Sequence, residues 1–198
     1  MEKIILASAS PRRRELLALL GLEFEIMVSE EPEDNIDKTL PPDIYTNELA
    51  VLKAVSVAKK LIKDKNESFT VISADTVVYC DGEILGKPAD EEDAIHMLSL
   101  LSDKVHSVYT GFCVLRTSDN YMVSKSVKTD VRFKKLTDDI ISGYVKTGEP
   151  MDKAGAYAIQ GKGAVLINKI DGDFFNVVGL PLAALCDVLC EDFGTNIF

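Results

Sequence analysis

The chain has 198 residues, of which 46% are hydrophobic, and it carries a formal net charge of −10 at pH 7. This length and apolar fraction suit a single domain over residues 1–198 with a sizeable core, either elongated or with two lobes. The acidic balance argues against a nucleic-acid partner, because a surface that follows a phosphate backbone needs an excess of basic residues. An anionic ligand must therefore bind in a local pocket.

No uninterrupted apolar run is long enough to span a bilayer, and the first residues lead directly into a predicted strand without a cleavable signal. We therefore expect a cytoplasmic protein with no membrane partner. The four cysteines form no CxxC pair, which favours reduced thiols. With only His96 and His106, a zinc site would need an unusual ligand set, so we expect any metal to have oxygen ligands.

The N-terminal segment predicts a strand followed by a helix. Residues 3–7 form an apolar β run, Ser10 is a good N-cap, and Pro11 suits the first helical position. Gly21 is typical of the residue at which a helix ends, and residues 23–28 predict a second strand.

Basic residues fill the first turn of this helix. Arg12 and Arg13 lie where free backbone N–H groups and the helix dipole favour an anion, and Ser8 and Ser10 add hydroxyls. Acidic residues would stabilise the helix better here, and such a local conflict indicates function. The pattern predicts a phosphate site; the alternative is a solvated turn whose arginines pair with carboxylates.

The rest of the chain alternates helical and extended patterns without internal repeats or linkers. The predicted elements are a helix over 43–63, a strand over 69–79 with a hairpin return over 83–85, a helix over 90–101, strands over 107–116 and 121–133, a helix from 137 to about 148, a hairpin of 164–170 and 174–178, and a helix from 181. Between them, residues 152–161 are small residues around one Tyr and one Gln, which lets the backbone approach a ligand closely.

Asp75 is the most unusual residue of the predicted sheet, because its strand neighbours are mostly apolar. A buried carboxylate needs a partner or a metal, although capping a local turn or pairing with a nearby lysine would also explain it. Lys53 lies mid-helix and Lys87 lies in the loop Gly86-Lys87-Pro88; for each, a surface lysine is the alternative.

Taken together, the two arginines and two lysines could neutralise phosphates, while Asp75 and Glu33 could bind a divalent ion or activate water. This set suits phosphoanhydride hydrolysis with Mg²⁺ or Mn²⁺, in which catalysis is mostly positioning and charge stabilisation. The chain lacks GxxxxGK[ST], which excludes a P-loop enzyme.

Six short motifs stand in order along essentially the whole chain. They are Ser8-x-Ser10-Pro11-Arg12-Arg13, Leu49-Ala50-x-x-Lys53-Ala54, Ala74-Asp75-Thr76, Gly86-Lys87-Pro88, Asp152-Lys153-Ala154-Gly155-Ala156-Tyr157-x-Ile159-Gln160-Gly161 and Val178-Gly179-Leu180-Pro181. In this order they resemble the Maf nucleotide pyrophosphatases, which are related in fold to the inosine triphosphate pyrophosphatases. We therefore expect an α/β fold with a twisted mixed β-sheet flanked by helices, in two lobes with a central nucleotide cleft.

The resemblance implies hydrolysis of a nucleoside triphosphate between its α and β phosphates, giving a monophosphate and pyrophosphate with a divalent metal. It makes Asp75 the proton acceptor that activates water, and a metal ligand together with Glu33. The other implied roles are substrate choice for Arg12, Thr76 and Gln160, phosphate binding for Arg13, Lys53 and Lys87, and substrate binding for Ser8.

The segment around Gln160 resembles the branch of the family that acts on dTTP and UTP rather than the branch that prefers 7-methyl-GTP. Its amide can meet the O4 and N3–H edge of a uracil or thymine ring. Tyr157 could stack on the base or support the loop. Ser73 stands where the family usually has Gly, and because a small residue is retained we expect little effect. Acceptance of modified pyrimidine triphosphates would make this a house-cleaning enzyme.

Two rival functions remain at this point. One keeps the chemistry but prefers 7-methyl-GTP or another modified purine. The other is a non-catalytic nucleotide-binding regulator, because the family has been linked to septum formation and cell division. Intact Asp75, Lys53 and Lys87 favour catalysis. The sequence leaves open whether apolar surface on the later strands forms a homodimer.

Overall fold

The computed structural model describes residues 2–32, 36–62 and 67–197. Its strands are β1 (Lys3–Leu6), β2 (Phe24–Ile26), β3 (Phe69–Cys80), β4 (Glu83–Leu85), β5 (Val105–Arg116), β6 (Met122–Phe133) and β7 (Ile167–Asp171). Its α-helices are α1 (Pro11–Ala18), α2 (Pro42–Leu61), α3 (Glu91–Leu101), α4 (Asp138–Val145), α5 (Phe174–Val178) and α6 (Leu182–Glu191). Short 3-10 turns occupy Glu149–Asp152, Ala154–Ala156 and Gly161–Leu166.

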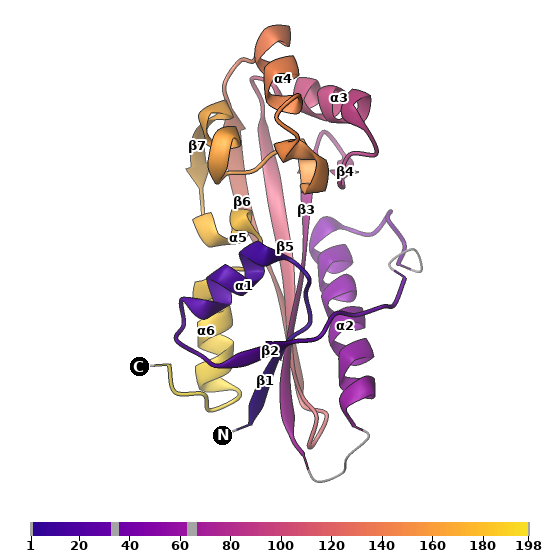
Figure 1. The fold of residues 1–198 in the computed structure, drawn as a ribbon, viewed down its shortest axis with the longest axis vertical. Helices are drawn as coiled ribbons and strands as arrows, with labels where there is room; N and C mark the ends of the chain where they lie inside the picture. The colour runs from indigo at the N-terminus through magenta and orange to yellow at the C-terminus, as the bar shows by residue number, and fades with distance from the viewer. Residues whose placement is uncertain (1, 33–35, 63–66, 198) are drawn as a thin grey trace. The chain divides into compact units, whose positions relative to one another are not determined.

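The strands form one twisted, mixed, seven-stranded sheet flanked by helices (Figure 1). The order is β2-β1-β3-β5-β6-β7, and β4 pairs with β3. β1 is parallel to both β2 and β3, whereas β4 is antiparallel to β3 and β7 is antiparallel to β6. The expected mixed α/β sheet is therefore confirmed. In the described part of the chain, no helix has the length and apolar character needed to cross a membrane.

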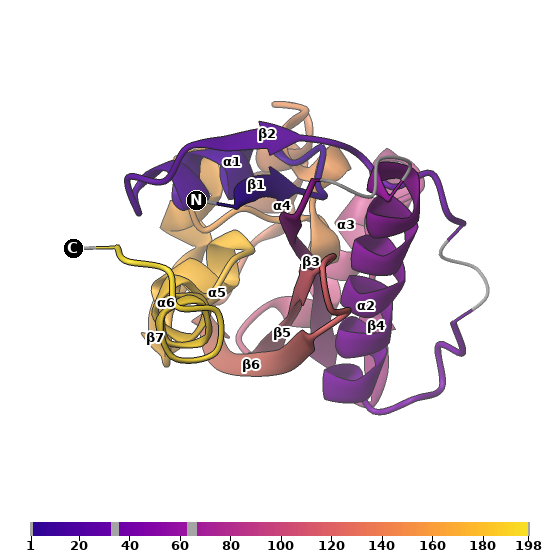
Figure 2. The ribbon, with the colours of Figure 1, turned by 90° about the horizontal axis from the view of Figure 1, so that it is seen from below.

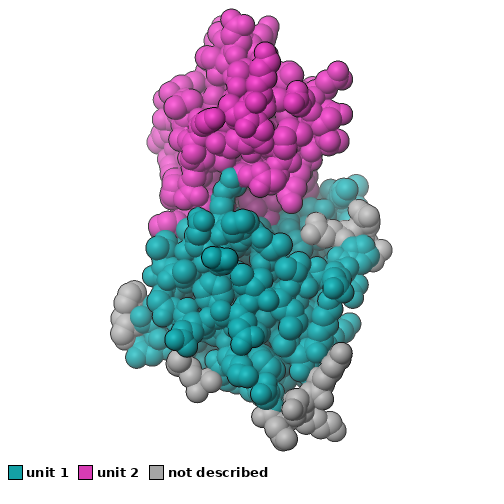
Figure 3. All heavy atoms as spheres, viewed as in Figure 1, with its two compact units in different colours: residues 1–75, 110–127, 179–198 teal, residues 76–109, 128–178 magenta. Residues whose placement is uncertain are grey.

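The chain divides into two compact units, coloured separately in Figure 3. Unit 1 contains residues 1–75, 110–127 and 179–198, and unit 2 contains residues 76–109 and 128–178. Three of the four boundaries fall inside β3, β5 and β6, and the fourth falls between Val178, the last residue of α5, and Gly179.

In unit 1, α2 covers one face of the strands, and α1 and α6 lie on the other (Figures 1 and 2). Small residues of α2, among them Ala50 and Ala54, pack with Ile5, Val71 and Cys113 from three strands. Gly111 of β5 permits this close packing, because a Cβ at that position would lie only 2.3 Å from the backbone carbon of Thr46 in α2. Only glycine lets the helix backbone approach the strand so closely.

Unit 2 has its own apolar core. α3 contributes Leu98 and Leu101, α4 contributes Ile141 and Val145, and Phe133 of β6 is among the largest buried side chains. The helix starts follow the capping residues that the sequence contains: Asp90 accepts from the Asp93 N–H at 2.9 Å, and Thr137 accepts from the Ile140 N–H at 3.4 Å.

Most predicted elements are confirmed with small shifts at their ends, including the hairpin of β3 and β4 and the turn between β5 and β6. The first helix ends at Ala18, before the predicted Gly21, which follows in a turn with φ +70°. The expectation of unpaired cysteines is also confirmed, since all four are free.

The predicted hairpin of 164–170 and 174–178 is wrong. β7 pairs with β6 instead, and Phe174–Val178 is the helix α5. The side chain of Asp173 explains the helix start, because its carboxylate accepts from the Phe175 N–H at 2.7 Å. Asn176, buried inside this helix, donates to the Val108 carbonyl at 3.1 Å and to the Thr129 hydroxyl at 3.0 Å. These tertiary contacts outweigh the β-branched character of the segment.

Candidate active site

Arg13 uses its guanidinium group to join three segments of unit 1. Its Nε donates to the Gly179 carbonyl at 2.8 Å, and its Nη1 donates to the Ala74 carbonyl at 2.7 Å and to Ser8 Oγ at 3.4 Å. These bonds explain why a basic residue is tolerated at a helix N-terminus that has no acidic residue in its first turn. The start of α1 is thereby fixed beside the residue that precedes Asp75.

Asp75 is paired with a lysine, which is one of the alternatives that the sequence left open. The Nζ atom of Lys53, which extends from the middle of α2, lies 2.5 Å from Asp75 Oδ1. The two side chains are only 14% and 13% exposed. A carboxylate and an ammonium group this well shielded from water compensate each other's loss of hydration. Of the alternatives that the sequence left open, the structure shows Asp75 paired with a lysine and Lys53 away from the surface.

Ser73 ties the same strand to the same helix. Its buried hydroxyl donates to the Ala50 carbonyl at 2.6 Å, one helical turn before Lys53. Four residues earlier on α2, Thr46 Oγ1 lies 3.2 Å from Ser126 Oγ of β6. The face of α2 that carries Lys53 is thus attached to the sheet by side-chain hydrogen bonds on the N-terminal side of the ion pair.

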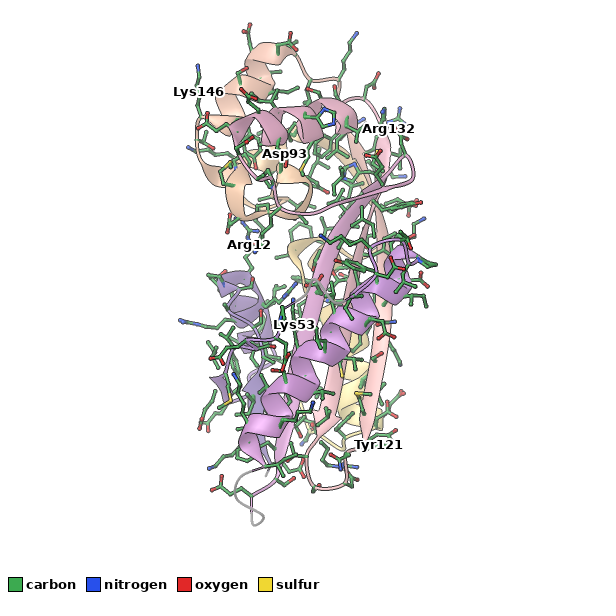
Figure 4. The ribbon with its side chains drawn as sticks, turned by 90° about the vertical axis from the view of Figure 1, so that its right-hand side faces the viewer. Arg12, Lys53, Asp93, Tyr121, Arg132 and Lys146 are labelled. Atoms are coloured by element: carbon green, nitrogen blue, oxygen red, sulfur yellow. The ribbon has the colours of Figure 1, made fainter. Side chains whose placement is uncertain are left out.

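The hydroxyls near α1 serve its start. Ser10 caps the helix, its Oγ accepting from the Arg13 N–H at 3.5 Å, and Ser8 Oγ accepts from the Ser10 N–H at 3.2 Å. Arg12, half-buried, extends from the first turn of α1 (Figure 4). The predicted N-cap at Ser10 is confirmed, and Ser8 and Arg13 are hydrogen-bonded to each other. The anion site that these residues were expected to form with Arg12 stays a prediction.

Thr76, Lys87 and Gln160 belong to unit 2. Thr76 is half-buried and follows Asp75 in β3, whereas Lys87 and Gln160 are exposed. The loops that carry Lys87 and Gln160 are joined at their bases, since the Gly155 N–H donates to the Gly86 carbonyl at 2.9 Å. Two segments far apart in the sequence are therefore neighbours within this unit.

Tyr157 supports the loop instead of offering its ring to a ligand, because its side chain is buried at 5% exposure. Its hydroxyl lies 2.8 Å from His106 Nε2, and its ring packs edge-on against those of Phe133 and His106. Burial lowers the pKa of His106 to about 4, so the imidazole is neutral at pH 7. Burial also raises the pKa of Tyr157, which keeps its hydroxyl protonated.

Glu33, the second predicted metal ligand, lies outside the described residues. Among the residues that are described, no group of three or more His, Cys, Asp or Glu side chains is arranged to hold a metal ion. Of the two predicted ligands, the structure therefore describes only Asp75, whose carboxylate is paired with Lys53.

A family model described as "Maf-like protein" matches residues 3–192, a span that contains the Arg13 bonds and the Lys53–Asp75 pair. The chain belongs to the Maf family. A protein of Thermoanaerobacter sp. (strain X514), named dTTP/UTP pyrophosphatase, is 50% identical over 98% of this chain and 99% of its own length. A protein of the same name from Acetivibrio thermocellus is 50% identical over all of this chain and 98% of its own length.

A solved structure supports the fold of this Maf protein. A HAM1 protein from Coxiella burnetii superposes with a TM-score of 0.53 and 18% sequence identity, covering 96% of this chain and 100% of that chain. The similarity concerns the fold alone. It agrees with the expectation of a twisted mixed sheet flanked by helices.

Sequence reasoning missed several residues that fix the site. It treated Ser73 as a neutral departure from the family, whereas its hydroxyl joins β3 to α2. It also passed over Tyr144 and Glu149, which hydrogen-bond to each other and to the loop of Gln160. The available signal was Gly148-Glu149-Pro150, a carboxylate placed in a turn just before a segment of small residues.

Replacing Ser73 with alanine removes the hydroxyl and leaves the Ala50 carbonyl with its helical partner alone. We expect the Ser73→Ala variant to lose about 1 kcal/mol of unfolding free energy, the usual contribution of one such bond. Urea unfolding of both proteins measures the loss. Ser126→Ala is the comparison on β6: it removes a half-buried hydroxyl that meets α2 away from the ion pair, so we expect a smaller loss than for the buried Ser73. Unchanged stability in Ser73→Ala would contradict the assigned bond.

Proposed function

We propose that this Maf protein is a nucleoside triphosphate pyrophosphatase that acts on dTTP and UTP, and on modified pyrimidine triphosphates. Full-length relatives at 50% identity that carry the name dTTP/UTP pyrophosphatase support this substrate class. The observation that carries the proposal is the Lys53–Asp75 pair beside the Arg13 bonds at the start of α1. A nearly buried carboxylate next to a cation suits proton transfer at a phosphoryl group.

In this proposal Asp75 accepts the proton of the attacking water. The water oxygen forms a bond to the α-phosphorus, and the bond from that phosphorus to the oxygen bridging to the β-phosphorus breaks. Pyrophosphate leaves with the electron pair of the broken bond. Lys53, held 2.5 Å from Asp75, would orient the carboxylate and stabilise the negative charge of the phosphates.

The remaining residues divide between phosphate binding and substrate choice. Ser8, Arg13 and Lys87 would bind phosphate oxygens, while Arg12, Thr76 and Gln160 would set substrate choice. In support, Arg12 lies in the first turn of α1, where backbone N–H groups also favour an anion. Gln160 presents an exposed amide on a loop with buried ends, an arrangement that suits hydrogen bonding to the edge of a base.

The family implies a divalent cation. The described residues fit a cation that is held partly by the protein and partly by the substrate. Mg²⁺ often binds through one or two carboxylates together with substrate phosphates, rather than in a site made only of protein groups. Asp75 would supply the carboxylate, with Glu33 as the second proposed ligand. When bound, Mg²⁺ or Mn²⁺ would neutralise charge on the phosphates.

Other features of the proposal concern the whole chain. Because one family model spans residues in both units, we propose that residues 1–198 act as a single catalytic domain. The nucleotide cleft, the cytoplasmic location, the homodimer and the link to septum formation stay predictions. The absence of nucleic-acid and membrane partners also stays a prediction, which the net charge of −10 supports for nucleic acid.

Pyrophosphate release from a panel of nucleoside triphosphates tests the reaction and its substrate class. With Mg²⁺ or Mn²⁺, we expect fast release from dTTP and UTP, little from purines, and none from Asp75→Asn, because an amide cannot accept the proton. The Asn variant should still bind nucleotide, measured by calorimetry. Release from 7-methyl-GTP alone would contradict the assigned substrate, and no release from any nucleotide would favour a regulator.

Removal of divalent cations tests the cofactor. We expect EDTA to stop pyrophosphate release and excess Mg²⁺ or Mn²⁺ to restore it, since charge on the phosphates would otherwise be poorly neutralised. The measurement is the initial rate before chelation, after chelation and after metal addition. Full activity in metal-free buffer would argue against the assigned ion.

Arg12→Ala tests the cationic first turn of α1. We expect kcat/KM for dTTP and UTP to fall by about one to three orders of magnitude, the range for loss of one charge-stabilising donor. Arg14→Ala is the matched control, because Arg14 lies on the same helix and is exposed. Equal rates for the wild type and Arg12→Ala would place Arg12 outside the substrate site.

A further inference from the structure

The loop that carries Gln160 combines an exposed tip with buried ends. Ala158 is 3% exposed, and Gly163 is also buried, whereas Gln160, Gly161 and Lys162 are exposed. The contacts at the buried ends of such a loop set the orientation of the residue that its tip presents to a ligand. All of these residues belong to unit 2.

The carboxylate of Glu149 receives three hydrogen bonds from this unit. Its Oε1 accepts from the Gly163 N–H and from the Tyr144 hydroxyl, each at 2.9 Å. Its Oε2 accepts from the Lys162 N–H at 3.0 Å. Two of the three donors are therefore backbone groups on the C-terminal side of Gln160. Hydrogen bonds to a charged acceptor are stronger than those between neutral groups.

Tyr144 extends the same network to the N-terminal side of Gln160. Its hydroxyl donates to Glu149 and accepts from the Ala158 N–H at 3.1 Å. The tyrosine ring is anchored in the unit 2 core, where the side chain is 6% exposed. One side-chain pair therefore holds the backbone on both sides of the glutamine.

The backbone packs closely around this pair. A Cβ on Gly163 would lie 2.4 Å from the Ala158 carbonyl oxygen and 2.5 Å from the Tyr144 hydroxyl oxygen. Gly161 has a φ of +81°, and a Cβ there would lie 2.8 Å from Glu149 Oε2. Side chains at these positions would displace the loop, so both glycines are needed for the loop to pass this close to Tyr144 and Glu149.

The position of an amide matters because its hydrogen bonds to a base edge depend on distance and angle. Binding groups need to be held to a fraction of an ångström by the residues around them. Glu149 and Tyr144 supply such support to Gln160, and the bond of Tyr157 to His106 supports the start of the same loop.

We propose that Glu149 and Tyr144 are positioning residues for nucleotide selectivity, which they set by fixing the loop that presents Gln160 to the pyrimidine base. The inference rests on the proposed function, in which Gln160 reads the base. Neither residue touches the nucleotide in this proposal. Their effect on catalysis is transmitted through Gln160 alone.

The test measures kcat and KM for UTP and CTP, whose bases present opposite hydrogen-bonding groups at position 4. In Glu149→Gln, an NH2 group replaces one carboxylate oxygen and meets a backbone N–H group, which loses its acceptor. In Tyr144→Phe, the hydroxyl that joins Glu149 to the Ala158 N–H is lost. We expect kcat/KM for UTP to fall about tenfold in each variant, mainly through KM, as for loss of one or two good hydrogen bonds. The UTP-to-CTP ratio should fall toward that of Gln160→Ala.

A double-mutant cycle separates this role from general destabilisation. If Glu149 acts through Gln160, adding Glu149→Gln to Gln160→Ala should change kcat/KM for UTP less than twofold, since coupled residues are not additive. An equal loss in both backgrounds, or an equal loss for UTP and CTP, overturns the proposal. Tyr144→Phe keeps the buried ring, so the test does not depend on the fold of one variant.

Ser102→Ala is the matched control in the same unit, because the bond it removes, from the Leu136 N–H to Ser102 Oγ at 2.8 Å, involves neither Tyr144 nor Glu149. We expect its UTP-to-CTP ratio to equal that of the wild type, and a comparable shift would overturn the proposal. A wild type that releases no pyrophosphate from any nucleotide overturns the proposed function and this inference together. An active wild type whose selectivity survives in both variants overturns this inference alone.

Discussion

The ion pair of Lys53 and Asp75 is the constraint on which the rest of unit 1 depends. With both side chains nearly buried, either charge alone would lose its hydration without compensation, so the pair requires a fixed helix and a fixed strand. Ser73 joins the two elements directly, and Arg13 adds α1 and the Gly179 segment through backbone carbonyls. Gly111 lets α2 lie close enough to the sheet for these bonds to form. Residues assigned to phosphate chemistry are therefore also the residues that hold the unit together.

Unit 2 uses a different kind of support for the residue assigned to the base. Its core contains α3, α4 and the aromatic rings around His106, and the loop of Gln160 is attached to that core through neutral and charged hydrogen bonds. A neutral imidazole at pH 7 suits this position, because a buried imidazolium would need a partner for its charge. The exposed amide is thus carried by a framework that hydrogen bonds and packed aromatic rings hold together within the unit.

Local signals in the sequence account for most of the fold. Ser10 caps the helix that it was expected to cap, Asp90 and Thr137 cap helices at the starts that were expected, and Asp81-Gly82 turns the hairpin of β3 and β4. The sequence failed where distant contacts decide the outcome, as at α5. There, Asn176 is bound by β5 and β6, which no local pattern reveals.

The candidate site was predictable to a similar extent. The need of Asp75 for a partner followed from the cost of burying a carboxylate, but the sequence did not single out Lys53 as that partner. The two carbonyl acceptors of Arg13, at Gly179 and Ala74, did not follow, because they come from segments that only the tertiary structure brings together. The same is true of Glu149, whose acceptor role depends on backbone N–H groups rather than on side-chain types.

The backbone that encircles the Glu149 carboxylate also limits how this loop can diversify. Donors at residues 162 and 163, together with the tyrosine bridge to residue 158, fix the number of residues between the two sides of the tip. An insertion or deletion within that span would break the register of these bonds. The chemical identity of the side chain at position 160 can change without disturbing them. A new base preference would therefore arise in this scaffold by substitution at the tip, with the length of the loop retained.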